Sequence, residues 1–174
     1  MEIQILDMIQ NLRTPVGDVI VPLISRLGNG GILWILLTLI LLIIPKTRKT
    51  GVIMMAALLV DLLLCNVLIK NLVARTRPFD VNTTVKLLIE KPHDYSFPSG
   101  HTAASFASVA ALYLAGAKKL WKPALVVAVL IALSRLYLYV HYPTDIIGGI
   151  VFGILSGYLG YKIVEFIQKR REKK

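Results

Sequence analysis

Residues 51–78 read GVIMMAALLVDLLLCNVLIKNLVARTRP, an apolar run that ends in a basic string containing a proline. Up to Leu72 the run is long enough to cross a bilayer as a helix, which takes about 20 mostly apolar residues. Asp61, Asn66 and Lys70 interrupt it, although such side chains are unusual at membrane depth. We interpret Asp61 as structural, either protonated or hydrogen-bonded to a neighbouring helix, and a place in a transport path is the alternative. The stretch predicts a transmembrane helix that carries polar groups.

The composition of the whole chain fits a membrane protein. Of the 174 residues, 56% are hydrophobic and 17% are charged, and the mean hydropathy is +0.68. Soluble domains carry more charge and less apolar mass, and this length suits one domain. We therefore expect residues 1–174 to form a single membrane-embedded domain. The lone Cys65 excludes an intrachain disulfide and is expected to be a small core residue.

Further apolar segments bring the expected number of spanning helices to about five. They cover residues 31–44, 102–117, 123–140 and 146–167. The first is short for a span and would have to recruit residues before Gly31. The last is rich in glycine, which lets neighbouring helices approach closely. The expected fold class is all-α, a polytopic transmembrane helix bundle.

Residues 1–28 are expected to lie on the membrane rather than to cross it. Ile3, Leu6, Ile9 and Leu12 recur at helical spacing with charged residues between them, and two prolines follow. This pattern is typical of amphipathic helices in the headgroup layer. A sixth span over this segment is the alternative.

The net charge of +10 is distributed as in a multi-pass protein of the cell membrane. Basic residues cluster just beyond the apolar segments, at 45–50, 118–122 and 168–174. Cytoplasmic flanks carry such an excess of Lys and Arg, so we expect a cytoplasmic C-terminus. The connection 75–101 and the turn around His141 would then lie on the extracytoplasmic face. This distribution argues against nucleic acid as a partner.

The first basic string contains Lys70 and Arg77, which are seven residues apart. This spacing would place them on one helix face, two turns apart, and Pro78 would turn the chain after Arg77. Taken alone, such cations fit contacts with lipid headgroups. For Arg75 we keep this interpretation, a headgroup or structural contact.

The second string is Pro98-Ser99-Gly100-His101, just before the apolar segment 102–117. Ser99 is a good N-cap, and the free N–H groups after it would form an anion site. Gly100 would let the backbone approach an oxyanion, and His101 could donate a proton beside it. An ordinary capped helix is the alternative for this string alone.

The third string is Ser134-Arg135, followed by His141 and Asp145. The last two are four residues apart, so the carboxylate can accept from one imidazole nitrogen and leave the other free to attack. Pro143 suits the first position of a helix. An acidic residue favoured by a helix N-terminus is the alternative reading. The sequence contains neither a Cys cluster nor a carboxylate cluster, so we expect no metal site.

Together the strings resemble the type 2 phosphatidic acid phosphatase family. That pattern is Lys, six residues, Arg-Pro; then Pro-Ser-Gly-His; then Ser-Arg, five residues, His, three residues, Asp. Every position matches with its spacing intact, and the surrounding helices, the expected catalytic core, cover residues 51–167. The resemblance implies a helical core shared with soluble acid phosphatases and vanadium haloperoxidases. It also implies metal-independent hydrolysis of a lipid phosphate through a phosphohistidine, without a cofactor.

Carried over to this chain, the resemblance makes His141 the nucleophile, Asp145 its orienting residue and His101 the general acid. The residues expected to bind the phosphate are Lys70, Arg77, Ser99, Gly100 and Arg135. Undecaprenyl pyrophosphate, phosphatidylglycerol phosphate and phosphatidic acid are the expected substrates, and the resemblance does not choose among them. A lipid-phosphate transporter or flippase is the alternative function, and it would not need the histidines. A haloperoxidase is disfavoured by the membrane spans, and the oligomeric state stays open.

Overall fold

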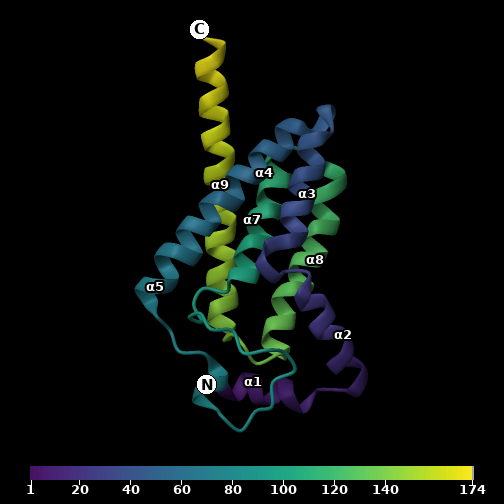
Figure 1. Cartoon of the computed structure of the whole chain (residues 1–174), viewed down its shortest axis with the longest axis vertical. Coiled ribbons are helices and arrows are strands. Elements are labelled where there is room, and N and C mark those ends of the chain that lie inside the picture. The colour runs from purple at the N-terminus through teal and green to yellow at the C-terminus, as the bar shows by residue number, and fades with distance from the viewer. Residues whose placement is uncertain (174) are drawn as a thin grey trace.

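The computed structural model describes residues 1–173, and its regular elements are helices (Figure 1). The α-helices are α1 (Glu2–Asn11), α2 (Pro15–Arg26), α3 (Ile32–Ile43), α4 (Arg48–Asp61), α5 (Lys70–Val73), α6 (Pro78–Val81), α7 (Gly100–Leu114), α8 (Lys118–Tyr137) and α9 (Pro143–Glu172). The short 3-10 turns η1 (Asn29–Gly31) and η2 (Pro45–Thr47) precede α3 and α4, and the π-helical segment η3 (Leu62–Ile69) joins α4 to α5. The expected all-α architecture is confirmed.

Helices α7 and α9 run parallel through the middle of the bundle, and α4 packs against α9 (Figure 1). A Cβ on Gly153 of α9 would lie 2.4 Å from the backbone O of Ala103 in α7. A Cβ on Gly160 would lie 2.4 Å from the backbone N of Ala57 in α4. These positions exclude any larger residue unless a backbone moves, as at close helix contacts in membranes. The parallel contact brings the N-terminal ends of α7 and α9 together.

Helix α4 continues through η3 into α5, which ends at Val73. Ala74 has a left-handed backbone, with φ at 47°, so the chain leaves the helix there. The predicted helix face shared by Lys70 and Arg77 is therefore wrong, because the helix ends between them. Arg77 instead has an extended backbone and precedes Pro78, the first residue of α6.

Three helical elements are long and apolar enough to cross a membrane: Pro45–Val81, Lys118–Tyr137 and Pro143–Glu172. A fourth qualifies if Pro15–Arg26 and Asn29–Ile43, which meet at a bend of 43°, form one span. By this measure residues 1–173 fall short of the five expected spans, because α7 has only 15 residues. The interfacial placement of residues 1–28 stays a prediction, since α2 can also be counted with α3.

The N-terminal helices lie across the end of the bundle where the connection 82–99 also runs (Figure 1). Leu6 of α1 is fully buried and belongs to a small apolar cluster with Phe79, Leu138 and Tyr139. The apolar face of α1 therefore covers protein. This end of the bundle also holds the N-terminal ends of α7 and α9 and the C-terminal end of α8, where the motif strings lie.

Candidate active site

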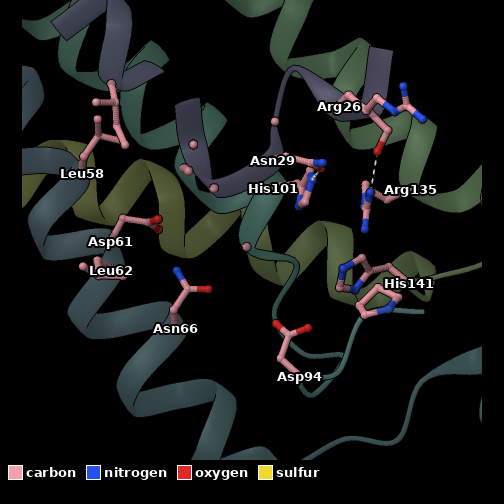
Figure 2. Close-up of a pocket in the computed structure, with 18 of the residues that line it drawn as sticks. Arg26, Asn29, Leu58, Asp61, Leu62, Asn66, Asp94, His101, Arg135 and His141 are labelled. Atoms are coloured by element: carbon pink, nitrogen blue, oxygen red, sulfur yellow. Dashed lines mark hydrogen bonds between the residues drawn. The ribbon is translucent and has the colours of Figure 1, made fainter. Parts of the chain in front are cut away.

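The three motif strings meet around a cavity of about 910 Å³. Lys70 and Arg77 come from the first string, and His101 from the start of α7. Arg135 comes from the last turn of α8, and His141 from the turn between α8 and α9. Figure 2 shows His101, Arg135 and His141 close together on one side of this cavity. Residues far apart in the sequence are thus gathered at one end of the bundle.

His141 lies in the turn before α9 and is 1% exposed. Pro143 is the first residue of α9, as predicted, and Asp145 stands at the third position of the helix. The Oδ2 atom of Asp145 is 3.4 Å from Nδ1 of His141. The same oxygen accepts from the backbone N–H of Tyr142 at 2.9 Å and from the hydroxyl of Ser96. The helix cap therefore holds the carboxylate facing the imidazole.

Arg77 lies on the other side of this imidazole. Its Nη1 atom is 3.3 Å from Nε2 of His141 and donates to the backbone O of Val140 at 2.6 Å. A guanidinium can only donate and a carboxylate can only accept, so we assign the proton to Nδ1 and the lone pair to Nε2. Burial, followed by the charges of Arg77 and Arg135, lowers the pKa of His141 to about 3. Asp145 opposes this effect but does not cancel it, so the imidazole is neutral at neutral pH.

The carboxylate of Asp94 connects two cations of the site. It forms ion pairs with Nζ of Lys70 and with Nη2 of Arg77, the latter at 2.7 Å. The backbone O of Asp94 also accepts from Nε of Arg77 at 2.8 Å. Burial acts to raise the pKa of Asp94, but the two cations hold it below its usual range. Sequence reasoning missed this residue, because one carboxylate in a polar connection carries no spacing signal.

The second string places Ser99 at the N-cap of α7, but its side chain makes no capping hydrogen bond. The capping role predicted for this side chain is wrong, because its Oγ accepts from Oγ1 of Thr102 at 3.0 Å instead. Gly100 lies in a crowded place. A Cβ there would be 2.7 Å from Oδ1 of Asn66 and 3.7 Å from Nζ of Lys70. The absence of a side chain at residue 100 therefore lets the backbone lie beside the Lys70 ammonium group.

His101 and Arg135 contact the N-terminal segment, which sequence reasoning did not assign to the site. Nε2 of His101 is 2.9 Å from Oδ1 of Asn29 (Figure 2), and Nη1 of Arg135 donates to the hydroxyl of Ser25. Arg135 is 3% exposed, and its Nε has no hydrogen-bond partner among the described residues. Arg135 is therefore a buried cation that lines the cavity and does not extend to the lipid headgroups. No sequence spacing links these contacts, which are purely tertiary.

Arg75 is bound within the protein. Its Nη1 donates to Oδ1 of Asp145 at 2.6 Å, and its Nη2 pairs with Oε2 of Glu2 at 2.5 Å. The guanidinium also lies over the ring of Tyr142, 3.8 Å from the ring centre. Of the two expected roles, these contacts support the structural one, through the carboxylate that faces His141.

Asp61 and Asn66 line the same cavity further along the helix from Lys70 (Figure 2). Asp61 is 2% exposed, and its Oδ1 has no hydrogen-bond partner in the part of the chain that the structure describes. The interhelical hydrogen bond expected as one alternative is not made by this atom. Within residues 1–173, no group of three or more His, Cys, Asp or Glu side chains could hold a metal ion.

Comparison with known proteins shows the family of this chain. Residues 33–169 match the PAP2 superfamily. The chain belongs to that superfamily. It is 36% identical to an undecaprenyl-diphosphatase of Sulfolobus acidocaldarius, over 80% of this chain and 67% of the relative.

Two solved structures share the fold. The crystal structure of LpxE from Aquifex aeolicus has a TM-score of 0.79 and 29% identity, covering 92% of this chain and 94% of that chain. The PAP2-type phosphatidylglycerolphosphate phosphatase from Bacillus subtilis has a TM-score of 0.75 and 28% identity, covering 95% and 85%. The predicted family and the transmembrane helix fold are confirmed, and these relatives give no support to the transporter alternative. The family match leaves out the first 32 residues, which include Glu2, Ser25 and Asn29.

Proposed function

We propose that this protein is an integral membrane lipid phosphatase that works through a phosphohistidine intermediate. The observation that carries the proposal is the orientation of His141. Its Nδ1 faces the Asp145 carboxylate, and its Nε2 faces Arg77 at the cavity. A neutral imidazole held in this way is a competent nucleophile. The phosphatase names of the relatives support the same class of reaction.

The lipid phosphate would bind among Lys70, Arg77 and Arg135, whose charges stabilise the equatorial oxygens in the transition state. Gly100 would add the N–H groups at the start of α7. The Ser99 hydroxyl accepts from Thr102, so its own proton stays available for a phosphate oxygen. Lys70, Arg77, Gly100 and Arg135 line the cavity, and Ser99 directly precedes Gly100 in the chain.

The reaction proceeds in two steps. His101 gains a second proton when a phosphate dianion binds beside it and so becomes the acid of the first step. Nε2 of His141 attacks phosphorus in line, and the bond from phosphorus to the leaving oxygen breaks while His101 passes this proton to that oxygen. His101 then takes a proton from a water molecule, whose oxygen attacks phosphorus and breaks the N–P bond. Inorganic phosphate leaves and the imidazole is restored. Asp145 keeps Nδ1 protonated and oriented throughout.

The rest of the cavity suits the apolar part of a lipid. It extends along α3, α4 and the start of η3, where it is lined by Ile35, Leu39, Leu58 and Leu62. The lipid chain would lie along this side while the phosphate reaches the cations. Undecaprenyl pyrophosphate and phosphatidylglycerol phosphate, which the names of the relatives indicate, and phosphatidic acid are the candidate substrates.

The site is placed on the extracytoplasmic face, with a cytoplasmic C-terminus. The basic clusters at 45–50, 118–122 and 168–174 support this orientation. The C-terminal end of α9 and the α3–α4 junction lie at the end of the bundle opposite α1 (Figure 1). In this proposal residues 51–167 form the catalytic core of one membrane-embedded domain, and residues 1–28 lie at the membrane surface.

The test is release of inorganic phosphate from the three candidate lipids by purified protein in detergent, with EDTA present. Wild type is compared with His141→Ala and with His93→Ala, a matched control because His93 is an exposed histidine of the connection 82–99. Wild type and His93→Ala should hydrolyse at least one lipid, and His141→Ala none above the uncatalysed rate. Wild-type protein that releases no phosphate would refute the function, and an active His141→Ala would refute the nucleophile. The ratios of kcat/KM rank the substrates.

A further inference from the structure

The buried carboxylate of Asp145 is held from two sides. Its Oδ2 faces Nδ1 of His141 at 3.4 Å, and its Oδ1 accepts from Nη1 of Arg75 at 2.6 Å. The Asp145 side chain is fully buried, whereas that of Arg75 is 27% exposed. Arg75 therefore binds one oxygen of the Asp145 carboxylate, Oδ1, while the other oxygen, Oδ2, faces the proposed nucleophile His141.

Arg75 is itself fixed by neighbours on two helices. Its Nη2 pairs with Oε2 of Glu2 at 2.5 Å, and its Nη1 donates to Oγ1 of Thr144 at 2.7 Å. Oε1 of Glu2 accepts from the backbone N–H of Thr144 at 3.1 Å and from its hydroxyl at 2.8 Å. These contacts tie α1 to the first turn of α9, beside the Tyr142 ring on which Arg75 stacks.

Arg75 is placed differently from the cations assigned to phosphate binding. Lys70, Arg77 and Arg135 line the cavity, whereas Arg75 is not among the described residues that do so. Its Nη atoms are directed to two carboxylates and a hydroxyl group. Among these partners, Asp145 is the one that faces His141.

We propose that Arg75 is a positioning residue for the His141–Asp145 pair, and that Glu2 holds Arg75 in place. The inference rests on the proposed function, in which His141 is the nucleophile. Glu2 lies outside the family match of residues 33–169. In this proposal, helix α1 helps to position the catalytic pair through Glu2. It also packs on the apolar cluster around Leu6 at this end of the bundle.

The physical reason is the cost of an unpaired buried acceptor. Without Arg75, Oδ1 of Asp145 loses its charge-assisted hydrogen bond in a buried position, which is unfavourable. The carboxylate is expected to turn away and lengthen its approach to Nδ1 of His141. In metal sites, mutating a residue that hydrogen-bonds a metal ligand lowers activity by about 10- to 100-fold. We expect a loss in a similar range when Arg75 is replaced.

The experiment uses the full chain with a C-terminal tag, so that the segment around Glu2 stays native. Arg75→Gln, Glu2→Gln and Arg13→Gln are compared with wild type for kcat, KM and thermal unfolding. Arg13 is the matched control, because it pairs with Asp18 at 2.8 Å in the same N-terminal region without contacting Asp145. Arg75→Gln should lower kcat about 10- to 100-fold, with KM changed less than about 2-fold. Glu2→Gln should show a smaller loss in kcat, and Arg13→Gln should match wild type.

A second readout separates positioning from general support of the fold. In Arg75→Ala, added guanidinium ion should restore at least about fivefold in kcat by refilling the site beside Asp145, whereas choline should not. A normal kcat in both Arg75→Gln and Glu2→Gln, a change in KM alone, or no rescue of a folded Arg75→Ala would overturn the inference. If Arg75 variants do not fold, a normal kcat in Glu2→Gln overturns it. Inactive wild type would instead refute the proposed function.

Discussion

Replacing Asp94 by Asn tests whether this carboxylate competes with the substrate phosphate. Asp94 engages Nζ of Lys70 and Nη2 of Arg77, two donors that the proposed mechanism assigns to phosphate. An anion can take both donors only by displacing the carboxylate. Asparagine keeps the size and one acceptor oxygen but removes the charge. We therefore expect Asp94→Asn to bind the phosphate analogue vanadate more tightly.

The expected size of the effect follows from the charges and their exposure. Two unit charges 4 Å apart attract by about 1 kcal/mol in bulk water and by about 4 kcal/mol at an effective dielectric constant of 20. The Asp94 side chain is 52% exposed, although those of Lys70 and Arg77 are 7% and 4% exposed. We take about 1.4 kcal/mol, near the lower limit, because solvent screens a half-exposed carboxylate. That corresponds to a Ki for vanadate about tenfold lower.

The assay is competitive inhibition of phosphate release by orthovanadate, at fixed pH and ionic strength. Asp80→Asn is the matched control, because Asp80 is an exposed carboxylate on α6 close in sequence to Arg77. Its Ki should differ from that of wild type by less than about 2-fold, since exposed distant charges are screened. An unchanged or higher Ki for Asp94→Asn would show that this carboxylate mainly holds the cations in place, and the reasoning would fail.

Two further predictions concern stability. The folded-state pKa of His141 is about 3, below the ordinary value of 6.5, so the unfolded chain binds an extra proton between these values and the free energy of unfolding should fall as the pH drops through this window. A plot of Tm against pH should be flatter in this window for His141→Asn than for wild type. An identical slope in the two proteins would contradict a neutral buried imidazole. Gly153→Ala should destabilise by about 1–3 kcal/mol, because its Cβ would lie 2.4 Å from Ala103 O; an unchanged Tm would contradict this contact.

Geometry within each string could be predicted from the sequence where local spacing determines it. His141 and Asp145 meet across the start of a helix that Pro143 begins, so their four-residue separation was informative. Lys70 and Arg77 lie together, but not through the helical spacing that the sequence suggests. The helical period does not extend through Ala74, whose left-handed backbone ends the helix. An alanine there gives no sign of this, because glycine, not alanine, is the residue that usually adopts the left-handed conformation.

Partners that reach the site from outside the strings could not be predicted. Asn29 is 72 positions from His101, and Glu2 is 73 positions from Arg75. Asp94 lies in a connection without periodicity, 17 positions after Arg77. Such pairs depend on how the connection 82–99 and the N-terminal helices fold over the end of the bundle. A pattern of spacings along one chain contains no information on that packing.

The π-helical segment Leu62–Ile69 directly precedes Lys70. A π-bulge is a widened turn that takes up an extra residue inside an α-helix, and each residue of an α-helix rotates the chain by about 100°. Deleting one residue from this segment would therefore convert it to regular α-helix and leave the ammonium group on nearly the same side, whereas deleting one residue from Arg48–Asp61 would swing it away from Asp94. A one-residue gap at 62–69 in a comparison of homologues would thus be compatible with the same pairing of Lys70 and Asp94, and a gap within α4 would not, even where hydropathy profiles coincide.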